Sequence, residues 1–268
     1  MKAGPQPVSG DTSLQKNYLV VGGTRGIGKA TVKYLVTDCS ANVIFCGRDA
    51  AAGSALCDSL AARAKSTVRF VAADIRLESD VASLFNVVGQ TLTTLDGAFN
   101  AAGVAGADSP MRGVRFHNSD EAIFDEVFSV NVKGIWRCLR RELAIMSRQR
   151  HGSVVNCASV AGLRAADSLS VSYTASKHAL LGLTRALAVE YSAEGIRVNA
   201  LCPGVIDTDM LDGMADELEA DLRRKNPAAR LGTALEVAVA AEFLLSDRSS
   251  YISGATLTID AGGLTGAL

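Results

Sequence analysis

The chain has 268 residues, a mass of 27.9 kDa, 48% apolar residues and a mean hydropathy of +0.20, which suits one large α/β domain or two small ones. A net charge of -1, with scattered lysines and arginines, gives no general attraction to nucleic acid or anionic lipid. No apolar run approaches the roughly 18 residues that span a bilayer, and six cysteines without a Cys-x-x-Cys pair indicate free thiols rather than a metal site. We therefore expect a soluble, cytoplasmic protein without a membrane, nucleic-acid or metal partner.

The first predicted element follows a polar segment, residues 1–16, which we expect to be a flexible lead-in without a signal-peptide core. A buried strand over 17–21 runs into the turn GGTRGIG at 22–28, and an amphipathic helix follows over 26–37. Glycines in such a turn let the backbone approach a pyrophosphate group at the positive N-terminus of the helix. The order of strand, turn and helix favours a dinucleotide site, with an ordinary tight turn as the alternative.

The end of the second predicted strand, residues 41–46, indicates which dinucleotide is preferred. NAD-binding folds carry an Asp or Glu here that binds a ribose hydroxyl, but this chain has Gly47 followed by Arg48. Arg48, together with Arg25 of the glycine turn, suits a 2′-phosphate, which guanidinium groups bind in a bidentate manner. NADP(H) is therefore the predicted cofactor, with a solvated Arg48 and a helix-capping Asp49 as the alternative.

Helices and strands continue to alternate up to residue 100. The predicted elements are a helix over 50–65, a strand over 68–73, a helix over 78–93 and a strand over 95–100. Asp74, after the first of these strands, is expected either to cap the next helix or to accept a bond from the adenine amino group. Apolar strands that alternate with helices predict a doubly wound parallel sheet covered on both faces.

The second half of the chain keeps the same alternation. An irregular stretch over 103–119 precedes a long predicted helix over 120–150 that contains Asn131. The later predicted elements are a strand over 154–157, a helix to about residue 193, a strand over 196–201, a helix over 235–245 and a strand over 255–260. Residues 209–226 are polar and are expected to form a mobile cover over a pocket. Because no linker or repeat interrupts this order, we predict one domain.

Tyr173 and Lys177 open the helix that ends near residue 193, and their spacing of four places them on one helical face. An ammonium group beside a phenol favours the phenolate, so the tyrosine can serve as an acid or a base near neutral pH. A solvated or packing pair is the alternative interpretation of this spacing alone.

Several motifs occur in the order in which one enzyme family carries them. They are GGTRGIG at 22–28, NAAG at 100–103, SVNVKG around Asn131, CASVAG around Ser159, YTASK at 173–177, PGVIDT at 203–208 and SGATLTIDAGG at 253–263. With these motifs the chain resembles the short-chain dehydrogenase/reductase family, in its branch of about 250 residues. The resemblance implies a single Rossmann-type α/β domain over 17–268, with about seven parallel strands.

The resemblance also implies a catalytic tetrad of Asn131, Ser159, Tyr173 and Lys177. Tyr173 would give a proton to the oxygen of a carbonyl that receives a hydride from the nicotinamide, and Ser159 would hydrogen-bond the same oxygen. Lys177 would bind the nicotinamide ribose and favour the phenolate. Asn131 would hold a water that links Lys177 to a proton relay.

The residues expected to contact NADP(H) follow from the same motifs. They are Gly22, Thr24, Arg25, Gly26, Ile27, Gly28, Arg48, Asp74, Ile75, Asn100, Ala102, Gly103, Tyr173, Lys177, Pro203, Gly204, Ile206 and Thr208. Members of the family usually form homodimers or homotetramers, so we expect the same here. The apolar residues Leu180, Leu183 and Leu187 are compatible with such an interface but serve equally well as core.

Three features depart from the family pattern. Val21 stands where a threonine is common, 14 positions rather than the usual 13 separate Ser159 from Tyr173, and the stretch over 103–119 is long. The last two affect loops that shape the substrate pocket. The leading hypothesis is an NADPH-dependent reductase of a small or medium lipophilic ketone. The alternatives are an alcohol dehydrogenase that works in the oxidative direction and an idle cofactor-binding module.

Overall fold

A central sheet of seven parallel strands runs through the protein in the order β3-β2-β1-β4-β5-β6-β9. The computed structural model describes residues 15–62, 64–107, 114–165, 169–211 and 216–265, so most of the predicted lead-in over 1–16 lies outside the described residues. The strands of the sheet are β1 (Asn17–Val21), β2 (Asn42–Gly47), β3 (Val68–Ala72), β4 (Gly97–Asn100), β5 (Gly152–Cys157), β6 (Ile196–Pro203) and β9 (Thr256–Ile259). The predicted doubly wound parallel sheet is confirmed.

The central strands are apolar at nearly every position because each face of the sheet is covered. Leu19 and Val21 of β1 join one buried cluster, whereas Val20 between them joins the other. Side chains alternate between the two faces along a strand, so a strand buried on both sides needs a continuous apolar run. This requirement explains why the sequence shows unbroken apolar runs rather than an alternating pattern.

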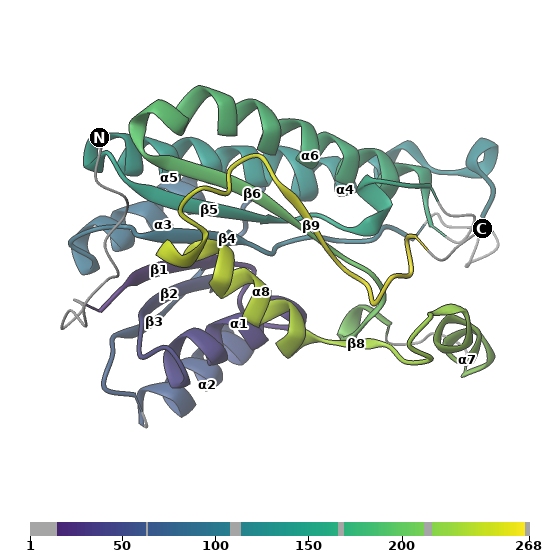
Figure 1. Ribbon diagram of the computed structural model, residues 1–268, viewed down its shortest axis with the longest axis horizontal. Helices are drawn as coiled ribbons and strands as arrows, with labels where there is room; N and C mark the ends of the chain where they lie inside the picture. Colours follow the sequence, from purple (N-terminus) through teal and green to yellow (C-terminus); the bar gives the residue numbers. More distant parts are fainter. Residues whose placement is uncertain (1–14, 63, 108–113, 166–168, 212–215, 266–268) are drawn as a thin grey trace, which may run out of the picture.

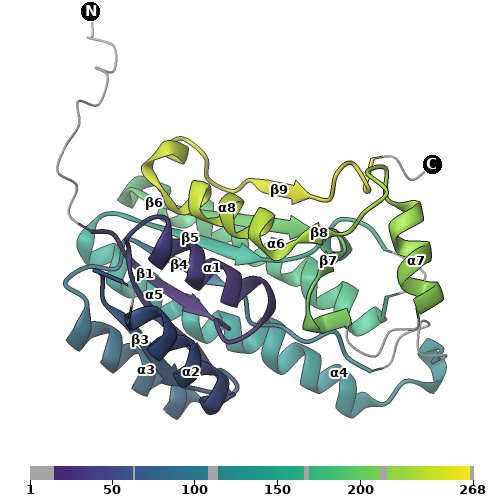
Figure 2. The ribbon, with the colours of Figure 1, turned by 90° about the horizontal axis from the view of Figure 1, so that it is seen from below.

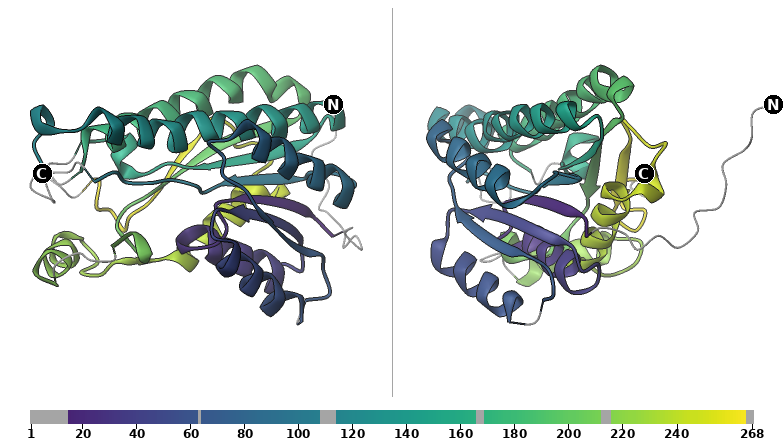
Figure 3. Two further views of the ribbon diagram at one scale, coloured as in Figure 1. Left: turned by 180° about the vertical axis from the view of Figure 1, so that it is seen from behind. Right: turned by 90° about the vertical axis from the view of Figure 1, so that its left-hand side faces the viewer.

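Helices form a layer on each face (Figures 1 and 2). One face is covered by α3 (Glu78–Thr91), α5 (Ile135–Gln149) and α6 (Val171–Tyr191), and the other by α1 (Gly26–Thr37), α2 (Ala50–Ala61) and α8 (Ala234–Leu245). Seen from the side, the sheet lies between the two layers (Figure 3). Leu180 of α6 is buried in the core, and Leu183 and Leu187 are partly buried against it. Of the two roles left open for these leucines, packing against the core is therefore observed.

The long helix predicted over 120–150 is divided into three parts. It consists of α4 (Glu121–Phe128), a π-helical turn over Ser129–Gly134 and α5. Asn131 lies in the middle of the wide turn, where its side chain bonds to a loop rather than to solvent. π-turns inside α-helices are rare and occur often at functional sites.

Beyond the carboxyl ends of the strands, the segment after β6 departs from the predicted layout. A second, two-stranded parallel sheet joins β7 (Ile206–Asp207) to β8 (Gly232–Thr233). The helix α7 (Asp216–Lys225) lies between them in the chain and extends away from the main sheet (Figure 1). The polar stretch over 209–226 is therefore helical in part, which agrees with what its mixed charge indicates.

The helices and the cysteines can be compared with the predictions about membrane spans and free thiols. Within the described ranges, no helix is both long and apolar enough to cross a membrane. All six cysteines are free thiols; four of them are buried, whereas Cys39 is exposed and Cys57 is intermediate. The prediction of free thiols is thus confirmed, and Cys39 and Cys57 are the two that are not buried.

Candidate active site

The loops that follow β1, β4, β5 and β6 meet at the carboxyl edge of the sheet. A side chain on Gly22, after β1, would place its Cβ only 2.6 Å from the backbone nitrogen of Ala102, after β4. A Cβ on Gly26 would lie 3.6 Å from Cβ of Thr208, after β6. In parallel α/β sheets this edge is where ligands bind. Segments far apart in the sequence are therefore brought together by the strand order.

The glycine turn at 22–28 requires glycine at both ends. Gly22 has a φ of +86°, which L side chains rarely adopt. A Cβ on Gly28 would lie 2.0 Å from the carbonyl oxygen of Gly22, a clash with backbone that cannot be relieved by a rotamer change. Arg25, the N-cap of α1, makes no side-chain bond to the first turn of the helix. The N-terminus of α1 therefore has no side-chain cap, and the glycines of the turn allow a ligand to approach the backbone closely. Both features fit a dinucleotide with phosphate groups.

The end of β2 is held against the same turn. A Cβ on Gly47 would lie 2.7 Å from Oγ1 and 2.6 Å from Cγ2 of Thr24, so the threonine occupies the space of the missing side chain. Arg48, the next residue, and Arg25 are both exposed. Asp49 caps α2 by accepting a bond of 2.9 Å from the nitrogen of Ala52, which is the role that the alternative interpretation gave it.

The carboxylate of Asp74, after β3, is held by Arg76. Oδ1 accepts from Nε at 3.0 Å, and Oδ2 accepts from Nη2 at 2.6 Å. These bonds hold the pKa of Asp74 below its usual range. Of the two roles left open for Asp74, capping of the next helix is not observed, because Leu77 is the N-cap of α3 and the Asp74 oxygens bond to Arg76 instead.

Tyr173 stands in the first turn of α6, which begins two residues earlier than its motif suggested. Ser170 is the N-cap: its hydroxyl accepts a bond of 3.0 Å from the nitrogen of Tyr173 and donates one of 3.2 Å to the carbonyl of Ala105. The Ser170 side chain thus joins the start of the helix to the loop after β4. This N-cap was missed in the sequence, although a serine three residues before a helical position is the usual signal.

Lys177 lies one turn after Tyr173, and both side chains are buried, with 5% and 8% exposure. The ammonium nitrogen is 5.5 Å from the centroid of the Tyr173 ring and donates a bond of 2.8 Å to the carbonyl of Cys157, at the end of β5. Ser159 is two residues further along, and its hydroxyl accepts a bond of 3.1 Å from the nitrogen of Ala161. The end of β5 therefore holds Lys177 and carries Ser159.

Asn131 is held by the loop after β4, close to the residue that also adjoins Lys177. Its side chain bonds to both backbone groups of Val104, with Oδ1 accepting at 2.8 Å and Nδ2 donating at 2.9 Å. A Cβ on Gly103 would lie 3.4 Å from this Oδ1 and 3.5 Å from Nζ of Lys177. A side chain at position 103 would therefore contact both the Asn131 amide and the Lys177 ammonium group.

Ser176 is a further buried residue that the motifs did not single out. Asn131 Nδ2 donates to its hydroxyl at 3.0 Å, and the hydroxyl donates to the carbonyl of Tyr173 at 2.7 Å. The available signal was its spacing, because a residue three positions after Tyr173 shares its helical face. The four predicted tetrad residues are therefore linked through β5, the loop after β4 and Ser176.

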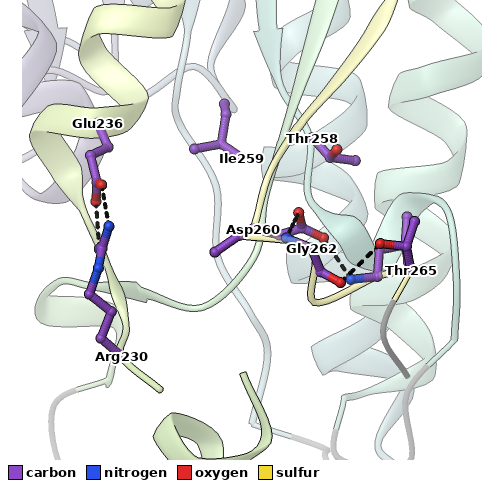
Figure 4. A pocket seen from close by; sticks show the side chains of 9 residues that line it. Arg230, Glu236, Thr258, Ile259, Asp260, Gly262 and Thr265 are labelled. Carbon is purple, nitrogen blue, oxygen red and sulfur yellow. Dashed lines mark hydrogen bonds and ion pairs between the residues drawn. The ribbon is translucent and has the colours of Figure 1, made fainter. Parts of the chain in front are cut away.

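A separate hollow of about 560 Å³ lies next to the segment after β6 (Figure 4). It contains none of the tetrad residues, and its walls are Arg230, Glu236, Thr258, Ile259, Asp260, Ala261, Gly262, Leu264 and Thr265. Arg230 donates to both oxygens of Glu236, at 3.0 and 2.7 Å, and lowers the pKa of Glu236 to about 2. The backbone nitrogen of Gly204 donates a bond of 3.0 Å to the carbonyl of Ile259, which lines the hollow. The hollow therefore adjoins Gly204, one of the residues expected to contact the cofactor.

The loops expected to shape the substrate pocket are described only in part. Residues 108–113, 166–168 and 212–215 lie outside the described residues, and with them Pro110, Arg112 and Asp167. Arg115 and His117, in the described part of the stretch over 103–119, are exposed.

Comparison with known proteins identifies the family. A family model described as enoyl-(acyl carrier protein) reductase matches residues 21–264. Levodione reductase of Leifsonia aquatica is 36% identical to this chain over 256 residues, which cover 91% of this chain and 92% of that protein. The chain belongs to the short-chain dehydrogenase/reductase family. A second relative, 2,5-dichloro-2,5-cyclohexadiene-1,4-diol dehydrogenase of Sphingobium indicum, is 38% identical over 254 residues, which cover 92% of this chain and 96% of the relative.

Solved structures show the same similarity to short-chain dehydrogenases/reductases. The crystal structure of levodione reductase superimposes with a TM-score of 0.84 at 32% identity and covers 93% of this chain and 98% of that chain. A structure of ElxO with NADP bound has a TM-score of 0.84 at 29% identity and covers 94% and 100% of the two chains. The protein is therefore an oxidoreductase that acts on CH–OH or C=O groups.

Proposed function

We propose that the protein is an NADPH-dependent reductase that converts a ketone of a small or medium lipophilic metabolite to a secondary alcohol. The observation that carries this proposal is the buried cluster of Tyr173, Lys177 and Asn131 at the carboxyl edge of the sheet. The ammonium nitrogen of Lys177 lies 5.5 Å from the centroid of the Tyr173 ring, so the phenol that would donate the proton stands beside a cationic group in a buried setting. Residues 17–268 would form the single catalytic domain.

Each tetrad residue has a separate role in the proposed reaction. The nicotinamide ring of the bound cofactor supplies the hydride to the carbonyl carbon. Tyr173 donates its phenolic proton to the carbonyl oxygen, and the Ser159 hydroxyl hydrogen-bonds that oxygen as negative charge develops on it. Lys177 stabilises the resulting phenolate. Asn131, fixed by Val104 and Ser176, holds the water that returns a proton through Lys177.

The preference for NADPH is argued from the end of β2. Gly47 provides no carboxylate for a ribose hydroxyl, and Thr24 occupies the space where one would have to fit. Arg48 and Arg25 are exposed and available for a 2′-phosphate. The NADP named in the ElxO structure gives the same direction. The remaining cofactor contacts are proposed at the motif positions given above, with Asp74 contributing beside Arg76.

The test is turnover of NADPH with a panel of cyclic and acyclic ketones that includes levodione, comparing wild type with Tyr173→Phe. General acid catalysis contributes roughly 10²- to 10⁴-fold, so kcat/KM is expected to fall by about that factor. Tyr191→Phe, the same change at the other end of α6, is the control and should keep wild-type activity. Undiminished turnover by Tyr173→Phe would refute the proposed proton donor.

Oxidation of an alcohol is the second candidate, because one relative of 38% identity is named as a diol dehydrogenase. Cofactor preference separates the two directions, since NADP pools usually drive reduction. A kcat/KM that favours NAD over NADP by tenfold or more, about 1.4 kcal/mol, would support the oxidative role. A preference for NADPH of the same size would support the reductase.

Assembly and compartment complete the proposal. Large apolar side chains are exposed on the outer surfaces of α5 and α6, including Trp136 and Val189. We infer that these surfaces pair in a homodimer or homotetramer. The free thiols suit the reducing cytoplasm.

A further inference from the structure

Glu142 is a fully buried carboxyl group on α5, eleven residues after Asn131 and outside the tetrad. It faces the sheet among Leu139, Leu143 and Met146, positions that an amphipathic helix normally fills with apolar side chains. A buried glutamate is costly unless it is paired or neutral. Its presence at this position therefore needs an explanation.

The carboxyl group is the first member of a row of hydrogen bonds that runs along one face of the sheet. The row extends from α5 to α6, and both helices cover this face (Figure 1). Asn100 of β4 donates from Nδ2 to Glu142 Oε2 at 3.1 Å and to Asn156 Oδ1 of β5 at 3.0 Å. Asn156 donates to the hydroxyl of Thr184 at 3.0 Å, and Thr184 donates to the carbonyl of Leu180 at 2.9 Å. Asn100 and Asn156 are paired directly across neighbouring strands.

Two oxygen atoms at the start of this row of hydrogen bonds have no donor. Among the described residues, buried side-chain atoms without a partner are Ser66 Oγ, Asn100 Oδ1 and Glu142 Oε1. The last two are the second oxygens of two groups that already share one bond. Both are acceptors if the acid is ionised, so neither can satisfy the other. A proton on Glu142 Oε1 turns it into a donor, and acid and amide can then form a ring with two hydrogen bonds.

The surroundings of Glu142 also disfavour an ionised carboxylate. Two thiols, Cys46 of β2 and Cys138 on its own helix, interact with it electrostatically, and neither brings a positive charge that would stabilise the carboxylate. The neighbouring side chains of α3, such as Leu84 and Val88, are apolar. Burial raises the pKa of Glu142 to about 8, although the bond from Asn100 acts in the opposite direction.

The geometry points to Glu142 as a neutral, protonated acid that pairs with the amide of Asn100 and so positions the ends of β4 and β5 beneath the active site. Asn100 directly precedes Ala101-Ala102-Gly103, the segment that contacts the glycine turn at Gly22. Asn156 directly precedes Cys157, whose carbonyl holds Lys177. Glu142 touches neither substrate nor cofactor, so it is a positioning residue. Its effect on turnover rests on the proposed function, whereas its protonation does not.

The protonation has a consequence for stability with a definite sign. The pKa of Glu142 is raised on folding, so between about pH 4.5 and 8 the folded protein holds a proton that the unfolded chain releases. The free energy of unfolding therefore falls as pH rises through that window, because the unfolded chain releases the proton more readily. Above about pH 8 the contribution of Glu142 no longer changes with pH. Glu142→Gln has an amide of the same shape, with a permanent donor and acceptor. Since this amide does not titrate, the variant lacks the pH-dependent contribution of Glu142 to stability.

The first experiment measures protonation directly. The infrared carbonyl absorption of a carboxylic acid should be present in the folded wild type at pH 7 and absent from Glu142→Gln. Denaturant midpoints should fall for wild type relative to Glu142→Gln from pH 5 to 8, while Glu190→Gln, which removes an exposed carboxylate from α6, should keep the wild-type slope. No acid absorption at pH 7, or parallel profiles for wild type and Glu142→Gln, would overturn the proposal.

The second experiment measures positioning. Glu142→Leu leaves the Asn100 amide without its partner and should lower kcat/KM by up to about 100-fold, as small displacements of catalytic groups do. Glu142→Gln should restore wild-type kcat/KM and make it less dependent on pH between 7 and 9. Equal losses in both variants would refute the positioning role. If wild type itself turns over no substrate, the proposed function fails, and the infrared result still decides the protonation.

Discussion

Gly47 shows how one small residue constrains cofactor choice. The end of β2 is where an acidic side chain would bind a ribose hydroxyl, yet Cγ2 and Oγ1 of Thr24 lie 2.6 and 2.7 Å from the expected Cβ of residue 47. A side chain at position 47 would therefore require the Thr24 side chain to move. The sequence showed that the acid was missing, and the structure adds that Thr24 lies against the position where its Cβ would be.

The neighbouring Arg48 gives a prediction at the same scale. Removing one bond between a guanidinium and a phosphate costs about 1.5 to 3 kcal/mol, or roughly ten- to hundredfold in affinity. Arg48→Ala should weaken NADPH binding by that factor and leave NADH binding unchanged. Titration of both cofactors by fluorescence measures this. A parallel loss of both would mean that Arg48 acts on the fold of the turn and not on the 2′-phosphate.

Asp74 and Glu142 mark the limit of residue-level prediction. The position of Asp74 after a strand was evident, but its bonds to Arg76 depend on a local turn that no motif encodes. Glu142 appeared in the sequence as one charge on a helix, because its partner Asn100 is 42 positions away. Burial of that charge becomes visible only when α5 packs on the sheet.

At the scale of elements, the N-cap of α6 links the helix start to the loop after β4. Ser170→Ala removes a cap worth about 1 kcal/mol and also frees the carbonyl of Ala105. We expect lower stability together with lower kcat, because Tyr173 stands in the first turn of this helix. Thermal unfolding and steady-state kinetics measure the two effects.

A matched control is available on α4. Asp120 caps that helix by accepting a bond of 2.9 Å from the nitrogen of Ala122, and it holds no tetrad residue in place. Asp120→Ala should lose similar stability but keep kcat. If the two variants lose kcat equally, the effect of Ser170 reflects general destabilisation.

Most elements were predictable because their patterns are local. The strand and helix around the glycine turn, over 17–21 and 26–37, match the structure to the residue. The helix predicted over 50–65 ends early, at Ala61, and the π-turn around Asn131 was not foreseen. The β7–β8 pair was also missed, since it joins two-residue strands that no periodicity can indicate.

At the scale of the whole molecule, the exposed apolar surface predicts self-association. Val189 is 84% exposed and Trp136 is 44% exposed, each on a helix of the same face. Equilibrium sedimentation should therefore give a multiple of 27.9 kDa. Trp136→Glu should shift the distribution toward the monomer, because a charge in an apolar interface is costly. A single species near 28 kDa for wild type would contradict the predicted assembly.

The order of the strands along the chain determines when each part of the sheet can form during synthesis. The strands β1, β2, β3 and β4 come from residues 17–100, an early and contiguous part of the chain, whereas α8, which packs on α1 and covers one face of this half, comes from residues 234–245. Pro203, at the end of β6, instead pairs with Ile259, and Gly204 bonds to the same residue. Proteins are synthesised from the N-terminus and their early parts fold first. The first four strands are therefore synthesised well before α8 covers their outer layer, and the edge of the sheet beside β6 forms only after residues 256–259 of β9 have been made.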